Sequence, residues 1–211
     1  MRVITGSARG TKLQAPAGEN TRPTTDRVKE AIFSMIQFDI EGRTVLDLFA
    51  GSGQMAIEAL SRGAARATLI DASRDAVNLI IENAKKTRLF DKCRISCADY
   101  GTFIRGASGR EKYDLVFLDP PYASGYIPKA LRGLSDGGML AQGSHIICET
   151  ENTIPPKAKT MKKDEAVART YILNDVFGGD EEFMATFEIL RSTLYSHTRI
   201  TVITPKTEQE A

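Results

Sequence analysis

The residues with the clearest chemical meaning form the tetrapeptide Asp119-Pro120-Pro121-Tyr122, which follows the apolar run 115–118. Prolines cannot donate to a strand ladder, so the pair ends the strand and stiffens the residues beside it. The Asp119 carboxylate and the Pro120 carbonyl can accept the hydrogens of an amine, and Tyr122 offers a face for a planar ring. This arrangement suits methylation of an exocyclic amine of a nucleic-acid base, with an ordinary Asp-Pro turn as the alternative.

A glycine turn between a strand and a helix provides the second candidate site. Gly51 and Gly53 allow the backbone to approach a ligand closely, and Asp71 stands twenty residues after Gly51, where an acid reaches the hydroxyl pair of a ribose. Asp47 suits a cationic ligand and would repel a pyrophosphate, although it could instead hydrogen-bond to the turn. The pattern therefore predicts S-adenosylmethionine as the cofactor.

A third acid, Asp99, follows the strand expected at residues 94–97. Ligands of open α/β sheets collect at the carboxyl ends of strands, where Asp99 could accept a hydrogen bond from the adenine amino group. It could at the same time be the N-cap of the helix expected at residues 100–106. The predicted cofactor residues are Asp47, Phe49, Ala50, Gly51, Ser52, Gly53, Asp71, Ala72, Asp99 and Tyr100.

The composition offers little material for metal or hydrolytic chemistry. The three cysteines lack the paired spacing of a zinc or redox site, and the two histidines, His145 and His197, are far apart. We expect reduced thiols and no bound metal. The chain shows neither a secretory signal nor an apolar stretch long enough to cross a bilayer, so we expect a cytoplasmic protein without membrane contact.

Basic residues are concentrated near the beginning of the chain. The net charge of +1 argues against binding nucleic acid by charge alone, but residues 1–29 contain six basic and two acidic side chains. This segment could contact phosphates, or it could be an ordinary solvated face. Its basic residues are Arg2, Arg9, Lys12, Arg22, Arg27 and Lys29.

The elements that must position these residues alternate between short β-rich runs and longer amphipathic runs, which predicts a parallel sheet covered by helices on both faces. We expect one domain over residues 1–211: a small β arm at 1–21 with strands at 2–5 and 11–13, a leading helix at 22–38, a core at 43–204 and a tail at 205–211. The expected strands are 44–48, 67–71, 94–97, 114–119, 145–150, 186–194 and 199–203, and the expected helices are 54–61, 74–87, 100–106 and 127–134.

Taken together, these motifs resemble the bacterial small-subunit ribosomal RNA guanine-N2 methyltransferase family over most of residues 2–150. The resemblance begins in the arm and is strongest in the stretch Arg22-Pro23-Thr24-Thr25-Asp26-Arg27-Val28-Lys29-Glu30-Ala31-Ile32-Phe33. The glycine turn, Asp71 and the tetrapeptide then follow in the family's order. The stretch 155–182 is longer and more polar than the family's course there, which predicts an insertion or a lid.

The resemblance implies a Rossmann-like class I methyltransferase fold of three α/β/α layers, with a seven-stranded, mostly parallel sheet and an antiparallel last strand pair. It implies a guanine target in 16S-type rRNA, which we expect to be presented by an assembling small ribosomal subunit and modified by a monomer. It also places Arg22, Pro23 and Thr24 at the mouth of the active site and gives Arg22 and Arg27 contacts to RNA phosphates. Arg9 and Lys12 of the arm complete the predicted RNA-binding set.

Three rival functions remain open on the sequence. The same tetrapeptide occurs in enzymes that methylate adenine or cytosine in DNA, but no large domain for reading a DNA sequence is visible. A nicotinamide-dependent oxidoreductase could use the same glycine turn, although Asp47 and the tetrapeptide argue against it. A catalytically inert RNA-binding module would be expected to have an altered Asp119 or Tyr122.

Overall fold

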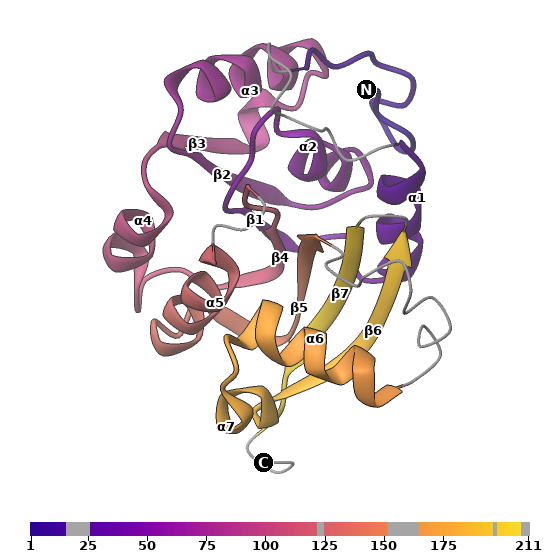
Figure 1. Ribbon diagram of the computed structural model, residues 1–211. Helices are drawn as coiled ribbons and strands as arrows, with labels where there is room; N and C mark the ends of the chain where they lie inside the picture. The colour runs from indigo at the N-terminus through magenta and orange to yellow at the C-terminus, as the bar shows by residue number, and fades with distance from the viewer. Residues whose placement is uncertain (16–25, 122–124, 152–164, 196–197, 208–211) are drawn as a thin grey trace.

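The computed structural model describes residues 1–15, 26–121, 125–151, 165–195 and 198–207 (Figure 1). Their strands form one seven-stranded sheet in the order β3-β2-β1-β4-β5-β7-β6. Strands β1 to β5 pair in parallel, whereas β7 lies antiparallel between β5 and β6. The strands are β1 Thr44–Asp47, β2 Arg66–Asp71, β3 Cys93–Cys97, β4 Tyr113–Leu118, β5 Leu140–Glu151, β6 Phe187–Tyr195 and β7 Thr198–Pro205.

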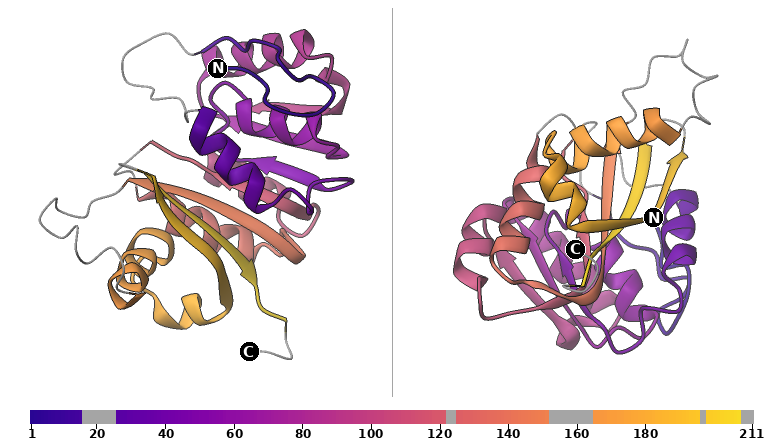
Figure 2. Two further views of the ribbon diagram at one scale, coloured as in Figure 1. Left: turned by 90° about the vertical axis from the view of Figure 1, so that its right-hand side faces the viewer. Right: turned by 90° about the horizontal axis from the view of Figure 1, so that it is seen from below.

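Helices cover the sheet on both sides, as Figure 2 shows from two further directions. Helices α1 Asp26–Met35, α2 Gln54–Ser61 and α3 Arg74–Lys86 share one apolar core with the N-terminal residues 1–15. We call residues 1–15 the arm and this side of the sheet the arm face. Helices α4 Tyr100–Ala107, α5 Tyr126–Asp136, α6 Glu165–Phe177 and α7 Glu181–Ala185 share the core of the other side, the α5 face. A short 3-10 turn, η1 Phe90–Lys92, leads into β3.

The central strands are apolar on both sides because both sides are covered. In β1, Val45 contributes to the core of the arm face and Leu46 to that of the α5 face, and both are fully buried. Successive side chains of a strand point to opposite faces, so a strand between two helical layers needs apolar residues at both positions. These observations confirm the predicted Rossmann-like α/β fold with an antiparallel last strand pair.

The beginning of the chain differs from the expected strands and helix. The predicted strands at 2–5 and 11–13 are reduced to one bridge between Arg2 and Lys12, because amides of the arm bond to side chains of α2 instead of to a ladder. The predicted leading helix, 22–38, is also too long in its described part, since α1 ends at Met35. A turn in which the Asp39 amide donates to the Ile36 carbonyl ends it. Residues 22–25 lie outside the described part.

Two boundaries in the second half of the chain also differ from expectation. β5 begins at Leu140 rather than at residue 145, because its pairing with β4 continues across a register shift between Tyr113 and Leu115. β7 extends to Pro205, which pairs with Phe187, so the predicted tail starts too early. The hairpin between β6 and β7 is confirmed by the pairing of Tyr195 with Thr198.

The described part of the stretch 155–182 is mostly helical. Ile172, Val176 and Phe177 of α6 are buried in the core of the α5 face, so this helix is a component of the helical layer. Gly178 and Gly179, both with positive φ, separate it from α7. Residues 155–164 lie outside the described part, and the prediction of an insertion or a lid stays a prediction.

Candidate functional site

Four acids stand at one edge of the sheet, each at or just after the carboxyl end of a parallel strand. Asp47 and Asp71 are the last residues of β1 and β2, Asp99 follows β3, and Asp119 follows β4 directly. Since these strands are neighbours in the order β3-β2-β1-β4, the acids follow one another along the edge. The strand order reverses between β1 and β4, and ligands of open α/β sheets bind at such a reversal. Asp47 and Asp119 flank it.

The glycine turn after β1 has the backbone form that the sequence predicts. Gly51 and Gly53 have φ angles of 54° and 75°, in the left-handed region that favours glycine. A Cβ at Gly53 would lie 3.1 Å from Leu69 and 3.3 Å from Ile80, whereas one at Gly51 would meet nothing within 4 Å. Gly53 is therefore needed for packing, and Gly51 presents bare backbone to open space where a ligand can approach.

Asp71 holds this turn in place through its carboxylate. One oxygen accepts a hydrogen bond from the Gly51 amide at 2.8 Å, and the other accepts one from the Ser73 amide at 2.8 Å. Each carboxylate oxygen has a second lone pair, so both remain able to accept from a ligand hydroxyl. The acid thus connects the end of β2 to the glycine turn after β1.

Asp47 lies beneath the turn and is only 2% exposed. Its carboxylate accepts a hydrogen bond from the Ala56 amide of α2 at 3.4 Å, so the alternative role considered for this residue is present. Burial, together with the nearby Asp71 charge, raises the pKa of Asp47 to about 7 against the opposing effect of hydrogen bonds from the Ala56 and Phe49 amides. Near neutral pH this acid can therefore exist in either charge state.

Asp99 is the N-cap of α4. Its Oδ1 accepts hydrogen bonds from the Gly101 and Thr102 amides at 3.0 and 3.1 Å, which is the helix-capping role considered for it. The side chain is exposed, so a ligand contact at the same acid is compatible with this geometry.

Three aromatic rings cluster beside these acids. The centroid of Tyr100 lies 5.4 Å from that of Phe49 and 5.1 Å from that of Tyr126, and the Phe49 and Tyr126 rings stack at 6.1 Å. Burial, together with the charges of Asp99 and Tyr126, raises the pKa of Tyr100. Tyr126 was missing from the predicted site. Its position as the first residue of α5, four residues after Tyr122, is the only signal that the sequence carries for it.

The described part of the tetrapeptide follows β4 without a break. Asp119 is half-buried, Pro120 is buried and Pro121 is exposed, while Tyr122 lies outside the described residues. Strand β4 is joined to β1 just before this point, where the Leu48 amide donates to the Phe117 carbonyl at 3.2 Å. The start of the tetrapeptide therefore leaves the sheet next to the glycine turn.

Exposed basic side chains of the arm and of α1 lie on the arm face. Arg9, Lys12 and Arg27 are exposed, whereas the predicted residues Arg22, Pro23 and Thr24 lie outside the described part. Lys29, which the sequence grouped with this basic segment, is 0% exposed. It cannot reach a phosphate in this conformation, and that part of the interpretation is wrong.

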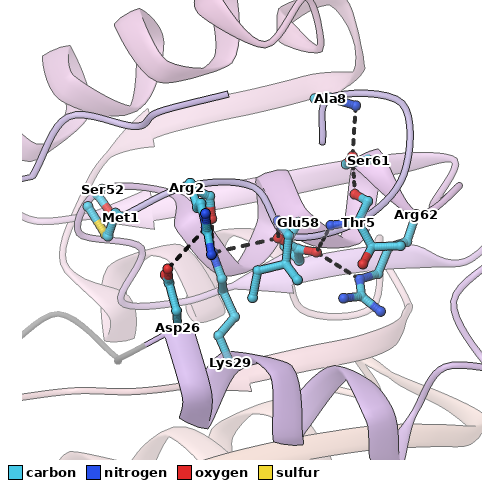
Figure 3. A network of polar contacts seen from close by, with 11 residues as sticks. Met1, Arg2, Thr5, Ala8, Asp26, Lys29, Ser52, Glu58, Ser61 and Arg62 are labelled. Carbon is cyan, nitrogen blue, oxygen red and sulfur yellow. Dashed lines mark hydrogen bonds and ion pairs between the residues drawn. The ribbon is translucent and has the colours of Figure 1, made fainter. Parts of the chain in front are cut away.

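Lys29 instead forms a buried ion pair that fastens the arm (Figure 3). Its Nζ lies 3.6 Å from the Glu58 carboxylate, both side chains are fully buried, and the Nζ also donates to the Arg2 carbonyl. Burial lowers the pKa of Lys29, and the Glu58 charge opposes that shift. The Glu58 carboxylate also accepts the Ile4 and Thr5 amides at 2.7 and 3.0 Å. This pair was missed, although a glutamate on the buried side of an apolar helix was a usable signal.

Ser61, one turn further along α2, fastens the middle of the arm. Its hydroxyl accepts the Ala8 amide at 3.0 Å and donates to the Thr5 carbonyl at 2.6 Å (Figure 3). Its carbonyl accepts the Ser7 amide at 2.8 Å. The helix that begins at the glycine turn thus carries two consecutive attachment points for the arm.

Within the described residues, no group of three or more histidine, cysteine, aspartate or glutamate side chains could hold a metal ion. No described helix is both long enough and apolar enough to cross a membrane.

Comparison with known proteins agrees with the fold. The family model described as Conserved hypothetical protein 95 matches residues 1–172. The chain is 39% identical over 155 residues to the Bacillus subtilis protein YlbH, named as an rRNA methyltransferase, and the match covers 73% of this chain and 84% of that protein. It is 36% identical over 157 residues to the Escherichia coli ribosomal RNA small subunit methyltransferase D, covering 74% and 78%.

Among solved structures, the chain is similar to the Escherichia coli protein yhhF, described as a methyltransferase. The TM-score is 0.75 with 27% identity, and the match covers 98% of each chain. A Haemophilus influenzae structure described as a methylase, HI0767, matches with a TM-score of 0.71 at 23% identity and supports the fold. The similarity to both structures extends over nearly the whole chain.

Proposed function

The chain belongs to the ribosomal RNA small subunit methyltransferase D family, and from that premise we propose that it methylates the exocyclic N2 of a guanine in small-subunit rRNA, using S-adenosylmethionine. The observation that carries the proposal is the row of acids along four adjacent strand ends, with Asp119 and Pro120 beside the Asp47 end of β1. That edge offers acceptors for an adenosine, for a cation and for an amine within one site.

The residues around the glycine turn fit the cofactor by their chemistry. S-adenosylmethionine, when bound, supplies an electrophilic methyl group on a sulfonium cation. We assign Asp71 to the ribose hydroxyls, Asp99 to the adenine amino group, and Asp47 to the positive charge. Gly51 faces open space and gives the backbone room to approach the ligand. The remaining proposed cofactor residues are Phe49, Ala50, Ser52, Gly53, Ala72 and Tyr100.

The proposed catalytic residues act on the amine of the base. Asp119 and the Pro120 carbonyl accept the amino hydrogens and direct the nitrogen lone pair toward the methyl group. Pro121 keeps this backbone rigid, and Tyr122 provides a face on which the base stacks. Asp119 is the proposed acceptor of the proton that the amine loses.

The RNA is proposed to approach over the arm face. Exposed Arg9, Lys12 and Arg27 carry positive charge there, and side chains of this type position nucleic acid through its phosphates. Arg22, Pro23 and Thr24 are proposed to complete this contact at the mouth of the site. We propose that one copy of the chain acts on a small subunit during its assembly.

Methyl transfer with a labelled cofactor tests the proposal. The protein is incubated with labelled S-adenosylmethionine and either small ribosomal subunits that lack the modification or DNA, and the product nucleosides are identified after digestion. We expect N2-methylguanosine from the subunits. N6-methyladenine or N4-methylcytosine from DNA would move the activity to a DNA methyltransferase, and no transfer to either substrate would refute the proposal.

An Asp119→Ala substitution tests the catalytic assignment. We expect turnover to fall by about 100- to 1,000-fold, the range for removing one group that stabilises a transition state, while the cofactor dissociation constant stays within about twofold. The matched control is Asp91→Ala, because Asp91 is exposed and precedes β3 at the opposite end of the sheet. Near-normal turnover of Asp119→Ala would show that the mechanism is wrong.

A further inference from the structure

One buried carboxamide connects the arm to the cofactor turn. Asn83 of α3 is 0% exposed, its Oδ1 accepts the Gln14 amide at 2.8 Å, and its Nδ2 donates to the Gln14 carbonyl at 3.1 Å. The second Nδ2 hydrogen is directed to the Ser52 carbonyl at 2.9 Å. A single side chain therefore satisfies both backbone groups of Gln14 and one backbone group of the glycine turn.

Ser52 stands between the two glycines of that turn. Its own hydroxyl lies 3.6 Å from the Met1 sulfur (Figure 3). The Leu13 amide donates to the Met1 carbonyl at 3.2 Å. Both ends of the described arm therefore meet at Ser52, one through its side chain and the other through Asn83. A shift of the turn must therefore be accommodated in these bonds.

The rest of the arm is fastened to the helix that begins at the same turn. α2 starts directly after Gly53, and its Glu58 and Ser61 hold the arm backbone between Ile4 and Ala8. The arm has one bridge and a few backbone bonds of its own, and it is held to the domain by these side chains and by the buried Val3, Ala8 and Leu13. The exposed cations Arg9 and Lys12 are thus carried on a segment whose place is set by the cofactor-binding unit.

We propose that Asn83 is a positioning residue that couples RNA binding on the arm to cofactor binding at the glycine turn. The inference rests on the proposed function, since it takes Arg9 and Lys12 as RNA contacts and Gly51 to Gly53 as cofactor contacts. A ligand on the turn restricts Ser52, and through Asn83 it also restricts Gln14 and the arm. RNA then binds an arm that has already lost part of its conformational freedom. Binding of either ligand therefore raises the affinity for the other.

This coupling is reciprocal and measurable as one number. The factor by which small ribosomal subunits lower the dissociation constant of the cofactor probe must equal the factor by which that probe lowers the dissociation constant of the subunits. S-adenosylhomocysteine serves as the cofactor probe, because it cannot transfer a methyl group during the measurement. We expect a factor of about fivefold or more in the unaltered protein, the lower end of measured couplings between two sites.

Asn83→Ala is the variant that breaks the connection. It removes all three bonds, and we expect the coupling factor to fall to about one while saturating turnover on subunits changes by less than about twofold. Thr87→Val is the matched control on the same helix. The Thr87 hydroxyl is buried and shares its one hydrogen between the Asn83 and Ala84 carbonyls, so this variant loses a buried hydrogen bond of the same helix without touching the arm or the turn.

The outcomes separate the inference from the proposed function. If the unaltered protein methylates subunits but shows a factor of one, or if Asn83→Ala keeps the full factor, the inference is overturned while the function stands. The inference is also overturned if Thr87→Val loses the coupling factor, because general destabilisation would then explain the loss in Asn83→Ala. Absence of methyl transfer by the unaltered protein is the separate failure of the function.

Hydrogen exchange on the unaltered protein provides a second test that does not require Asn83→Ala to fold. We expect S-adenosylhomocysteine alone to slow exchange of the Gln14 amide, which donates to Asn83, and of the Ile4 and Thr5 amides, which donate to Glu58. Unchanged exchange at Gln14 in the presence of saturating ligand would overturn the proposed connection.

Discussion

The two faces of the sheet are packed in different ways. The arm face buries Lys29, Glu58, Asn83 and Asp47, whose polar atoms bond to backbone groups of the arm, of the glycine turn and of α2. The α5 face is held mainly by aliphatic side chains and by a cluster of Phe177, Phe183 and Phe187, and its buried Arg199 on β7 bonds to Ser192 of the neighbouring strand. Both faces have a large apolar core, and on the arm face buried polar side chains also fasten the arm and the glycine turn.

The difference indicates how each face can respond to a single substitution. An apolar layer distributes its stabilisation over many weak contacts, so losing one of them changes stability without moving a particular segment. A buried polar group left without its partner costs more and affects the segment that it held. We therefore expect changes on the arm face to alter both stability and ligand binding, and changes on the α5 face to alter stability alone.

The largest expected effect comes from Glu58→Ala. The substitution removes the acceptor of the Ile4 and Thr5 amides and leaves the Lys29 charge buried without its partner, a loss of about 3–5 kcal/mol in the free energy of unfolding. Urea unfolding followed by circular dichroism measures it. The control Glu188→Ala, at an exposed position of β6, should stay within about 0.5 kcal/mol. Equal losses in the two variants would contradict the comparison.

A smaller, pH-dependent effect is expected from Asp47→Asn. The pKa of Asp47 is raised from 3.8 to about 7, so between these values the unfolded chain has released a proton that the folded protein keeps. The folded state therefore loses stability as pH rises through this window, and the loss is constant above it. Asparagine keeps an acceptor for the Ala56 amide but does not titrate.

The variant should thus gain stability over the unaltered protein as pH increases, by on the order of 2–4 kcal/mol at pH 8. Urea unfolding at a series of pH values between 4 and 8 measures the difference. The affinity of the unaltered protein for the cationic cofactor should also rise as pH passes 7, and that rise should be absent from Asp47→Asn. Parallel stability profiles would show that Asp47 titrates normally.

The smallest expected effect comes from Phe177→Leu on the α5 face. The ring of Phe177 lies 5.8 Å from that of Phe183 and 5.6 Å from that of Phe187, and its loss should lower the free energy of unfolding by about 1–2 kcal/mol. Cofactor affinity and its coupling to RNA should not change. Calorimetric unfolding measures the stability, and a cofactor titration measures the affinity. A lower cofactor affinity in this variant would contradict the comparison of the two faces.

Much of the fold and part of the site could be predicted from local sequence patterns. Helix α2 has the predicted bounds. The other predicted core helices and parallel strands, apart from β5, differ from the structure by at most two residues at either end. The glycine turn and the spacing to Asp71 also follow from local signals, because backbone conformation and strand alternation depend on the types of neighbouring residues. These signals were enough to place four acids at one edge of the sheet.

The sequence by itself determined the order of the elements, the edge of the sheet that carries the acids and the chemical types of the candidate site. The tertiary structure alone decided that Lys29 is buried against Glu58, that Asn83 joins Gln14 to Ser52, and that Tyr126 meets Phe49 and Tyr100. Each of these contacts joins different elements of the fold, Asn83 reaching Gln14 across 69 positions. Periodicity and spacing describe neighbours along the chain, whereas burial and pairing depend on which elements the folded sheet brings together.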